Sequence, residues 1–239
     1  MAPTLVLLHG FTHTGASWDP ARCELGERYR ALAPDLPGHG AASTWEPITL
    51  ERVIADLGSL AEGRFTLAGY SMGGRLALHV ALAEPARVER LVLIGASPGI
   101  ADPAEREERR RADERLADGL ERSSIEEFAD RWAQAPVLAG QPASVREAAR
   151  ADRLRSAPAG LARALRALGT GSLPSLWDRL RELTMPVTLV VGECDEKFRA
   201  IAEEMDATLP AGTVRVVHGA GHAVHLEAPA EVAATLAGG

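Results

Sequence analysis

The stretch that decides the fold runs from Phe65 to Gly74 and reads Phe-Thr-Leu-Ala-Gly-Tyr-Ser-Met-Gly-Gly. Its first four residues suit a short buried strand, and the residues after Ser71 follow a helical pattern that ends near Pro85. G-x-S-x-G between a strand and a helix is the pattern of a nucleophile elbow, in which a strained turn exposes the serine hydroxyl. The flanking glycines are required because side chains in so tight a turn would collide. The sequence therefore predicts Ser71 as a nucleophile at the carboxyl end of a strand.

Short apolar runs on both sides of this elbow alternate with longer helical patterns, which is typical of a parallel sheet flanked by helices. Several runs are apolar throughout, as expected for strands covered on both faces. A helix is also predicted over residues 50–60, where apolar residues recur at i, i+3, i+4 and i+7. We therefore predict an α/β fold with a mostly parallel sheet of about six strands: Thr4–Leu8, Tyr29–Ala33, Phe65–Ala68, Leu91–Ile94, Val187–Val191 and Thr213–Val217.

The alternation of strands and helices breaks between about Ser97 and Asp178. Helical, arginine-rich stretches such as Ala104–Leu116 and Ser124–Ala135 follow one another there, separated by prolines. Strand patterns return at Val187. We therefore predict a helical insertion at 97–182 within an α/β core formed by 1–96 and 183–239. Because strands end at both joins, the insertion is expected to be a cap over the site, although a surface excursion is the alternative.

A serine nucleophile needs a base, and His222 is the best placed of the seven histidines. It lies in the loop His218-Gly-Ala-Gly-His222-Ala-Val-His225, after the last predicted strand. The carboxyl ends of strands are where open α/β sheets place their sites. His225 is the second choice, while His79 within a helix and His39 within a turn fit structural roles better.

The acid that orients the base should follow another strand, between the serine and the histidine in the chain. The strand at 187–191 is followed by Gly-Glu-Cys-Asp, which makes Asp195 the predicted acid. It would hold the tautomer of His222 and stabilise the imidazolium. Glu193 and Glu196 are weaker candidates, and a solvated acidic loop is the alternative.

The oxyanion hole is expected from backbone N–H groups close to the elbow. His9-Gly-Phe-Thr leaves the first strand, so Phe11 and Met72 are the predicted donors, with His9 in a structural role. The sequence carries neither a glycine-rich phosphate motif nor a convincing metal cluster, because the spacing of the three histidines at 218, 222 and 225 suits a loop. No cofactor and no metal are therefore expected.

Composition excludes several classes of protein. The chain has 239 residues, 46% hydrophobic and 25% charged, and a net charge of −7, which argues against a nucleic-acid binder. Its two cysteines fit neither a disulfide framework nor a zinc site. The chain shows no basic leader and no apolar run approaching the ~18 residues of a membrane span. We expect a cytoplasmic protein, by default a monomer, that acts on a small molecule.

These residues resemble the α/β-hydrolase superfamily across nearly the whole chain, with the usual N-terminal hairpin missing. A closer resemblance is to 2-succinyl-6-hydroxy-2,4-cyclohexadiene-1-carboxylate (SHCHC) synthase, a lyase of menaquinone biosynthesis. That family eliminates pyruvate from the tricarboxylate SEPHCHC. The resemblance rests on four stretches: Gly69–Arg75, Ser97–Ile100 with the charged run to Arg115, Leu154–Ser156 and Gly192–Arg199.

The resemblance implies that Arg75, Arg109 and Arg155 bind substrate carboxylates and that Tyr70 and Trp132 line the pocket. Guanidinium groups suit such a substrate because each can bind a carboxylate through two parallel hydrogen bonds. The alternative for the cap arginines is a solvated helix face paired with glutamates at i, i+4. The family also has arginine where this chain has a cysteine at position 194, which is expected to be a buried, inert thiol.

The resemblance also changes the expected chemistry. In the lyase the serine–histidine pair abstracts a proton, and the oxyanion donors stabilise an enolate-like intermediate without an acyl-enzyme. The alternative is a serine carboxylesterase, in which Ser71 becomes acylated by a small ester. A third possibility, a non-catalytic ligand receptor, is disfavoured because all three catalytic residues are present.

Overall fold

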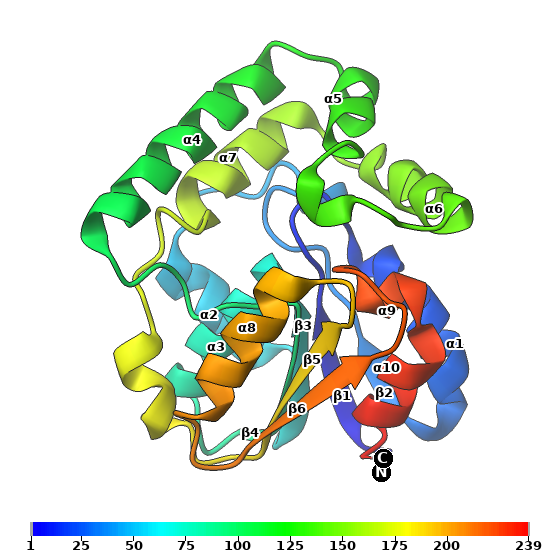
Figure 1. Ribbon diagram of the computed structural model, residues 1–239, viewed down its shortest axis with the longest axis vertical. Coiled ribbons are helices and arrows are strands. Elements are labelled where there is room, and N and C mark those ends of the chain that lie inside the picture. Colours follow the sequence, from blue (N-terminus) through cyan, green and yellow to red (C-terminus); the bar gives the residue numbers. More distant parts are fainter. Residues whose placement is uncertain (1, 239) are drawn as a thin grey trace.

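A computed structural model describes residues 2–238 and contains one six-stranded parallel sheet (Figure 1). The strand order is β2-β1-β3-β4-β5-β6, and every neighbouring pair is parallel. Each strand overlaps a predicted one, and within residues 2–238 no strand precedes β1. The strands are β1 (Thr4–Leu8), β2 (Arg30–Leu32), β3 (Phe65–Tyr70), β4 (Val88–Ile94), β5 (Val187–Gly192) and β6 (Gly212–Val217).

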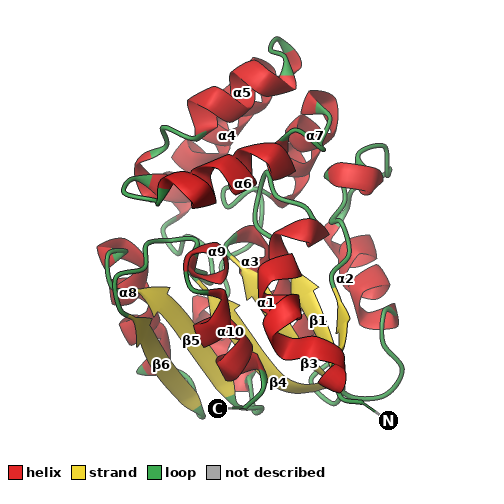
Figure 2. Cartoon of the chain, turned by 90° about the vertical axis from the view of Figure 1, so that its right-hand side faces the viewer, coloured by secondary structure: helices red, strands yellow, loops and turns green. Residues whose placement is uncertain are grey.

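Helices cover both faces of the sheet (Figures 1 and 2). Alternate residues of β1 point to opposite faces: Leu5 and Leu7 pack with α1 and α10, whereas Val6 and Leu8 pack with α2, α3 and α8. The sheet is therefore buried between two apolar layers. The flanking helices are α1 (Asp19–Leu25), α2 (Leu50–Ser59), α3 (Met72–Ala83), α8 (Glu196–Asp206), α9 (Val224–Glu227) and α10 (Pro229–Leu236), with short 3-10 turns η1 (Gly15–Trp18), η2 (Gly26–Arg28) and η3 (Gly40–Ala42).

Four α-helices lie over the carboxyl ends of the strands, between β4 and β5 in the chain (Figure 2). Three of them, α4, α5 and α7, share a small apolar cluster, which includes Leu120, Phe128 and Leu161. We call these four helices the cap: α4 (Pro103–Glu121), α5 (Ile125–Trp132), α6 (Ala143–Arg153) and α7 (Pro158–Leu168), with the 3-10 turn η4 (Pro136–Leu138).

The cap ends earlier than the predicted boundary at residue 182. Leu173, Leu176 and Leu180 are buried in the main core, the last within the 3-10 helix η5 (Trp177–Glu182). The segment from 173 onward therefore belongs to the core by its packing. The prediction missed this because apolar residues in a short 3-10 segment lack the periodicity that distinguishes core from cap.

Local capping explains where several helices begin. Asp102 accepts a hydrogen bond from the N–H of Glu105 (2.8 Å), and Pro103 occupies the first turn of α4, where its missing N–H is tolerated. Ser124 and Glu127 form a reciprocal capping box at the start of α5. None of the helices within residues 2–238 has the length and hydropathy that a membrane span requires.

Candidate active site

The turn from β3 into α3 holds Ser71 in a conformation that few non-glycine residues adopt, with φ 50° and ψ −110°. Two neighbouring glycines make this turn possible. A Cβ on Gly69 would lie 2.4 Å from the carbonyl carbon of Gly73, and a Cβ on Gly73 would lie 2.3 Å from the carbonyl oxygen of Leu8. The elbow is therefore fixed by backbone packing, and its strain turns the serine toward the cap.

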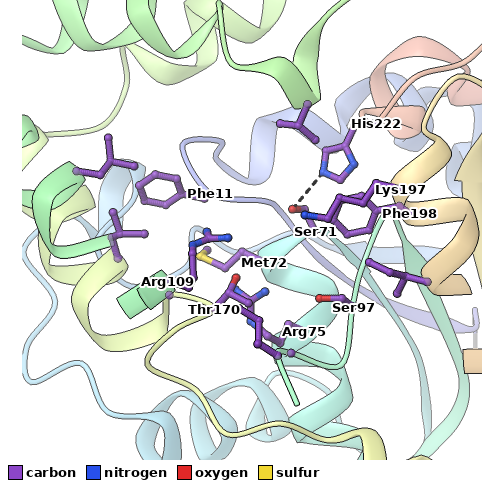
Figure 3. Close-up of a pocket in the computed structure, with 18 of the residues that line it drawn as sticks. Phe11, Ser71, Met72, Arg75, Ser97, Arg109, Thr170, Lys197, Phe198 and His222 are labelled. Carbon is purple, nitrogen blue, oxygen red and sulfur yellow. Dashed lines mark hydrogen bonds between the residues drawn. The ribbon is translucent and has the colours of Figure 1, made fainter. Parts of the chain in front are cut away.

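The structure brings the three predicted catalytic residues together. His222 Nε2 lies 3.3 Å from Ser71 Oγ (Figure 3), and His222 Nδ1 lies 2.7 Å from Asp195 Oδ2. Both His222 and Asp195 are buried. With its Nδ1–H donated to the carboxylate, the imidazole presents an unprotonated Nε2 to the serine hydroxyl. This geometry allows His222 to accept a proton either from the Ser71 hydroxyl or from a substrate bound next to that hydroxyl.

Asp195 is held in place by the helix that it caps. Its Oδ1 accepts the N–H of Phe198 (3.4 Å) at the start of α8, and its own N–H donates to the carbonyl of Gly192 (3.1 Å). Glu193, one of the weaker candidates, pairs instead with the exposed His218 (2.7 Å). The geometry therefore favours Asp195 over its acidic neighbours.

The remaining histidines near the site are part of the scaffold. His9 Nε2 accepts the N–H of Leu36 (2.8 Å), and its Nδ1 donates to the carbonyl of Gly10 (2.9 Å). Burial lowers the pKa of His9 to about 4, so the ring is neutral at pH 7. His225 packs against Tyr70 at 4.2 Å between ring centroids, and burial lowers its pKa well below the usual value.

The two predicted oxyanion donors lie beside the serine. Met72 is the first residue of α3, where backbone N–H groups have no partner within the helix. Phe11 follows β1 and precedes Thr12, which also has a positive φ of 72°. Phe11, Met72 and Ser71 line the same cavity. Their placement fits the predicted oxyanion hole, which stays a prediction.

A cavity of about 300 Å³ separates the cap from the carboxyl ends of the strands (Figure 3). Arg75, Arg109 and Trp132, which the family resemblance implies as substrate-binding residues, line it, and their binding role stays a prediction. It is bounded by Phe11, Ser71, Met72, Arg75, Gly95, Ser97, Gly99, Ile100, Arg109, Leu116, Trp132, Val137, Leu165, Gly169, Thr170, Trp177, Lys197, Phe198, Ile201 and His222.

Two guanidinium groups give one side of this cavity a positive charge. Arg75 is 7% exposed, and its Nε has no hydrogen-bond partner among residues 2–238. Burial, assisted by the charge of Arg109, lowers the pKa of Arg75 to about 10, which still leaves it charged at pH 7. Arg109 donates its Nε to the buried carboxylate of Asp113 (2.7 Å). Arg75, a buried cation with a donor that lacks a partner in the described chain, is suited to bind an anionic ligand.

A smaller chamber of about 50 Å³ also adjoins Ser71 and His222, and the Phe11 and Trp132 rings line both this chamber and the main cavity. Tyr70 lines this chamber rather than the larger cavity. Burial raises the pKa of Tyr70, so its hydroxyl stays neutral and can donate a hydrogen bond.

Arg153, which the sequence analysis missed, lines this smaller chamber, whereas the predicted Arg155 lines neither chamber. The Arg155 side chain is 65% exposed and lies 4.0 Å from Asp152. Arg153 is 1% exposed, bonds Thr12 Oγ1 (3.2 Å) and has a buried terminal nitrogen without a partner in the described chain. The signal was the buried face of α6, where Ala149, Asp152 and Arg153 follow helical spacing.

Across residues 2–238, no group of three or more histidine, cysteine or acidic side chains is arranged to hold a metal ion.

The prediction that Cys194 is buried is wrong, because its thiol is free and exposed. Its N–H bonds the carbonyl of Ala220 (2.9 Å), so the backbone that carries Asp195 is anchored independently of the cysteine side chain.

Known proteins resemble this chain over nearly its full length. A model of the alpha/beta hydrolase family matches residues 5–235. The 2-succinyl-6-hydroxy-2,4-cyclohexadiene-1-carboxylate synthase of Salmonella paratyphi C (strain RKS4594) is 37% identical, over 99% of this chain and 93% of that protein. The structure of MenH from S. aureus has a TM-score of 0.94 and 33% identity, and the match covers 100% of this chain and 93% of that one. A thermophilic esterase from Thermogutta terrifontis, with malate bound, has a TM-score of 0.81 and 28% identity, covering 99% and 88%.

The family model spans most of the chain, and the Salmonella relative exceeds 30% identity over almost its whole length. The esterase shares the fold at lower identity and lower structural similarity than MenH does. The chain therefore belongs to the alpha/beta hydrolase family and, within it, to the family of SHCHC synthases.

Proposed function

We propose that this protein eliminates pyruvate from SEPHCHC to give SHCHC in menaquinone biosynthesis. The observation that carries the proposal is the cavity itself, in which Ser71 and His222 face two guanidinium groups across about 300 Å³. The relatives named SHCHC synthase and MenH support the same reaction. The proposal includes a cytoplasmic enzyme that acts, as a monomer, on a small anionic substrate.

In this reaction the Ser71–His222 pair removes a proton from a substrate carbon next to a carbonyl group. The proton reaches His222 Nε2, and the resulting imidazolium is stabilised by the buried carboxylate of Asp195 at 2.7 Å. The electron pair left on carbon is delocalised onto the carbonyl oxygen. In this proposal the N–H groups of Phe11 and Met72, two residues that line the cavity, stabilise that oxygen as negative charge develops on it.

The enolate-like intermediate then expels the leaving group. Its electron pair re-forms a carbon–carbon double bond, the carbon–oxygen bond breaks, and enolpyruvate departs and takes up a proton to become pyruvate. No bond between Ser71 Oγ and the substrate is needed. The serine therefore acts as part of the base, whereas in an esterase it would become acylated.

The cationic groups orient the substrate for this step. Arg75 and Arg109 lie in the main cavity, and Arg153 reaches the smaller chamber beside Ser71. Arg75 and Arg153 each carry a buried nitrogen without a partner in the described chain. A substrate carboxylate that accepts a hydrogen bond from such a nitrogen relieves the cost of leaving that buried donor unpaired. The substrate therefore gains binding energy at these two arginines.

Pyruvate release from SEPHCHC tests the proposal. We expect fast release by the unaltered protein, a loss of about 10⁴-fold in Ser71→Ala, and a loss of about 10²-fold in Arg75→Met because a buried charge-assisted contact disappears. Release no faster than the spontaneous background would contradict the proposal. If a p-nitrophenyl ester were then cleaved with dependence on Ser71 but not on Arg75, the protein would be a carboxylesterase instead.

A further inference from the structure

Lys197 is the only lysine of the chain. Lysine and arginine together number 26, so 25 positive residues are arginine. The chain therefore has a single side-chain ammonium group among its basic residues. Lys197 carries this ammonium group and lines the active-site cavity.

The position of Lys197 is set by the catalytic acid. Asp195 caps α8, and Lys197 is the second residue of that helix, so both side chains start from the same turn. The ammonium lies 5.9 Å from the ring centroid of Phe198, whose ring in turn packs 4.5 Å from that of His222. In Figure 3 Lys197 lies beside Phe198 and His222, on the opposite side of the cavity from Arg109.

Lys197 differs from the cavity arginines in its partners. Arg109 pairs with Asp113, and Arg75 bonds the carbonyl of Leu168 (3.4 Å). Lys197 has no carboxylate partner in residues 2–238, and it is exposed whereas Arg75 is buried. The cavity therefore has two interacting guanidinium groups on one side and one unpaired, solvent-accessible ammonium on the side of the base.

We propose that Lys197 binds the carboxylate of the enolpyruvyl group, the part of the substrate that leaves as pyruvate. This proposal rests on the proposed lyase function. Arg75 and Arg109 line the main cavity and Arg153 lines the smaller chamber, and these three guanidinium groups suit the two carboxylates of the part of the substrate that is retained. The third carboxylate then meets the cation beside His222, close to the bond that breaks.

The chemistry of an ammonium suits a departing group. Its charge is compact and strongly hydrated on a flexible stem, whereas a guanidinium binds a carboxylate through a rigid pair of hydrogen bonds. An exposed lysine would hold the enolpyruvyl carboxylate during elimination and exchange it for water afterwards. The expected contribution is modest, because exposed ion pairs are screened by solvent.

Product inhibition separates the two sides of the cavity. In Lys197→Met the inhibition constant for pyruvate should rise about three- to tenfold while that for SHCHC stays unchanged. In Arg109→Met the reverse is expected. Lys197→Arg should retain much of the pyruvate inhibition, and Arg111→Met, which removes an exposed cation from α4, should alter neither constant. Equal inhibition by pyruvate in Lys197→Met and the unaltered protein would overturn the proposal.

The single lysine also permits a measurement that does not depend on turnover. Reductive methylation with ¹³C-formaldehyde keeps the charge and labels one side-chain amine, together with the α-amine at the start of the chain. Titration with pyruvate should shift the lysine signal, and Lys197→Arg identifies that signal by removing it. A pyruvate-independent lysine signal would contradict the proposal. An enzyme that fails to release pyruvate from SEPHCHC but shows this shift would contradict the lyase function and leave the Lys197 carboxylate site standing.

Discussion

In the sheet core, the residues around Ser71 are held by backbone contacts, whereas the cap presents its cavity residues on helices stabilised by ion pairs. The core glycines at 69 and 73 have no room for a methyl group. In α4, by contrast, a Cβ on Gly119 would meet nothing within 4 Å, and Arg109 is oriented by a carboxylate four residues further along the helix. The core thus fixes the reacting atoms by close packing, and the cap determines substrate contacts that can change without disturbing the elbow.

The largest effect is expected from a methyl group in the elbow. Gly73→Ala places its Cβ 2.3 Å from Leu8 O and 2.5 Å from His9 O, so the first strand and the elbow must separate. We expect at least about a 10³-fold loss of pyruvate release, since a shift of ~1 Å at a catalytic group costs about 10²-fold or more. The free energy of unfolding should fall by about 2–3 kcal/mol in urea titrations.

The matched substitution in the cap is Gly119→Ala. Because the helix has space there, alanine should stabilise the protein by about 0.5–1 kcal/mol and leave activity unchanged. If both substitutions had similar effects, the contrast between a sterically fixed core and a tolerant cap would be wrong.

Acid should destabilise the core through its buried histidines, since no histidine occurs between residues 97 and 182. Burial lowers the pKa values of His9 and His79 to about 4 and that of His39 to about 3, from the usual 6.5. Below pH 6.5 these histidines become protonated in the unfolded chain, whereas they stay neutral in the folded protein until the pH approaches 4. Stability is therefore fully present above pH 6.5 and falls as the pH drops toward 4, by up to about 1.4 kcal/mol per pH unit for each histidine.

Urea unfolding at pH 7, 6 and 5 measures this slope. Burial lowers the pKa values of His13 and His225 as well, so His79→Leu removes one of five such histidines and the slope should become shallower by about one fifth. A free energy of unfolding that stays level between pH 7 and pH 5 would show that these histidines are not held neutral in the folded protein.

The junction between cap and core depends on one buried carboxylate. Asp152 of α6 accepts hydrogen bonds from the N–H and hydroxyl groups of Thr14, and from His13 Nδ1 (3.0 Å). Burial by itself would raise the pKa of Asp152, but these hydrogen bonds outweigh it and lower the pKa to about 2. Asp152→Asn should therefore cost about 2–3 kcal/mol, because an amide NH₂ would face hydrogen-bond donors.

The control for this junction lies within the cap. Asp130 pairs with Arg150 at 2.6 Å, but both side chains are exposed. Asp130→Asn should change the free energy of unfolding by less than about 1 kcal/mol. Hydrogen exchange should also become faster in α6 of Asp152→Asn, and equal exchange in the two variants would argue against a buried anchor.

The core of the site was predictable because its pattern is local. The elbow glycines, the strands that precede Ser71 and Asp195, and the loop of His222 each leave a signature within about ten residues of sequence. Parallel strands then bring their carboxyl ends to one edge of the sheet, which is why residues 151 positions apart meet.

The cap was less predictable because the direction of its side chains depends on how α6 docks on the core. Arg153 and Arg155 differ by two positions, and the contact of Asp152 with Thr14 decides which of them points inward. The role of Lys197 in lining the cavity depends likewise on the cap above it. The exposure of Cys194 was missed for the same reason, since burial of a loop residue reflects neighbours that are distant in sequence.

The smallest effect is expected from Asp113→Asn, which loosens the orientation of Arg109 without removing this arginine. Asp113 is buried and accepts Arg109 Nε at 2.7 Å, while its second oxygen lies 3.4 Å from the N–H of Gly171. This bond uses only Nε, so the two terminal nitrogens of Arg109 remain available to a carboxylate. In Asp113→Asn, KM for SEPHCHC should rise about five- to tenfold with kcat nearly unchanged, as expected when a binding contact loosens.

A double-mutant cycle with Arg109→Met tests whether Asp113 acts through that arginine. If it does, adding Asp113→Asn to Arg109→Met should raise KM no further, so the two effects are not additive. Glu107→Gln is the matched control, because Glu107 pairs only with exposed arginines, Arg110 and Arg111, on the same helix. Additive effects would mean that Asp113 supports the cap through Gly171, and the cap would then resemble the core in being fixed by backbone contacts.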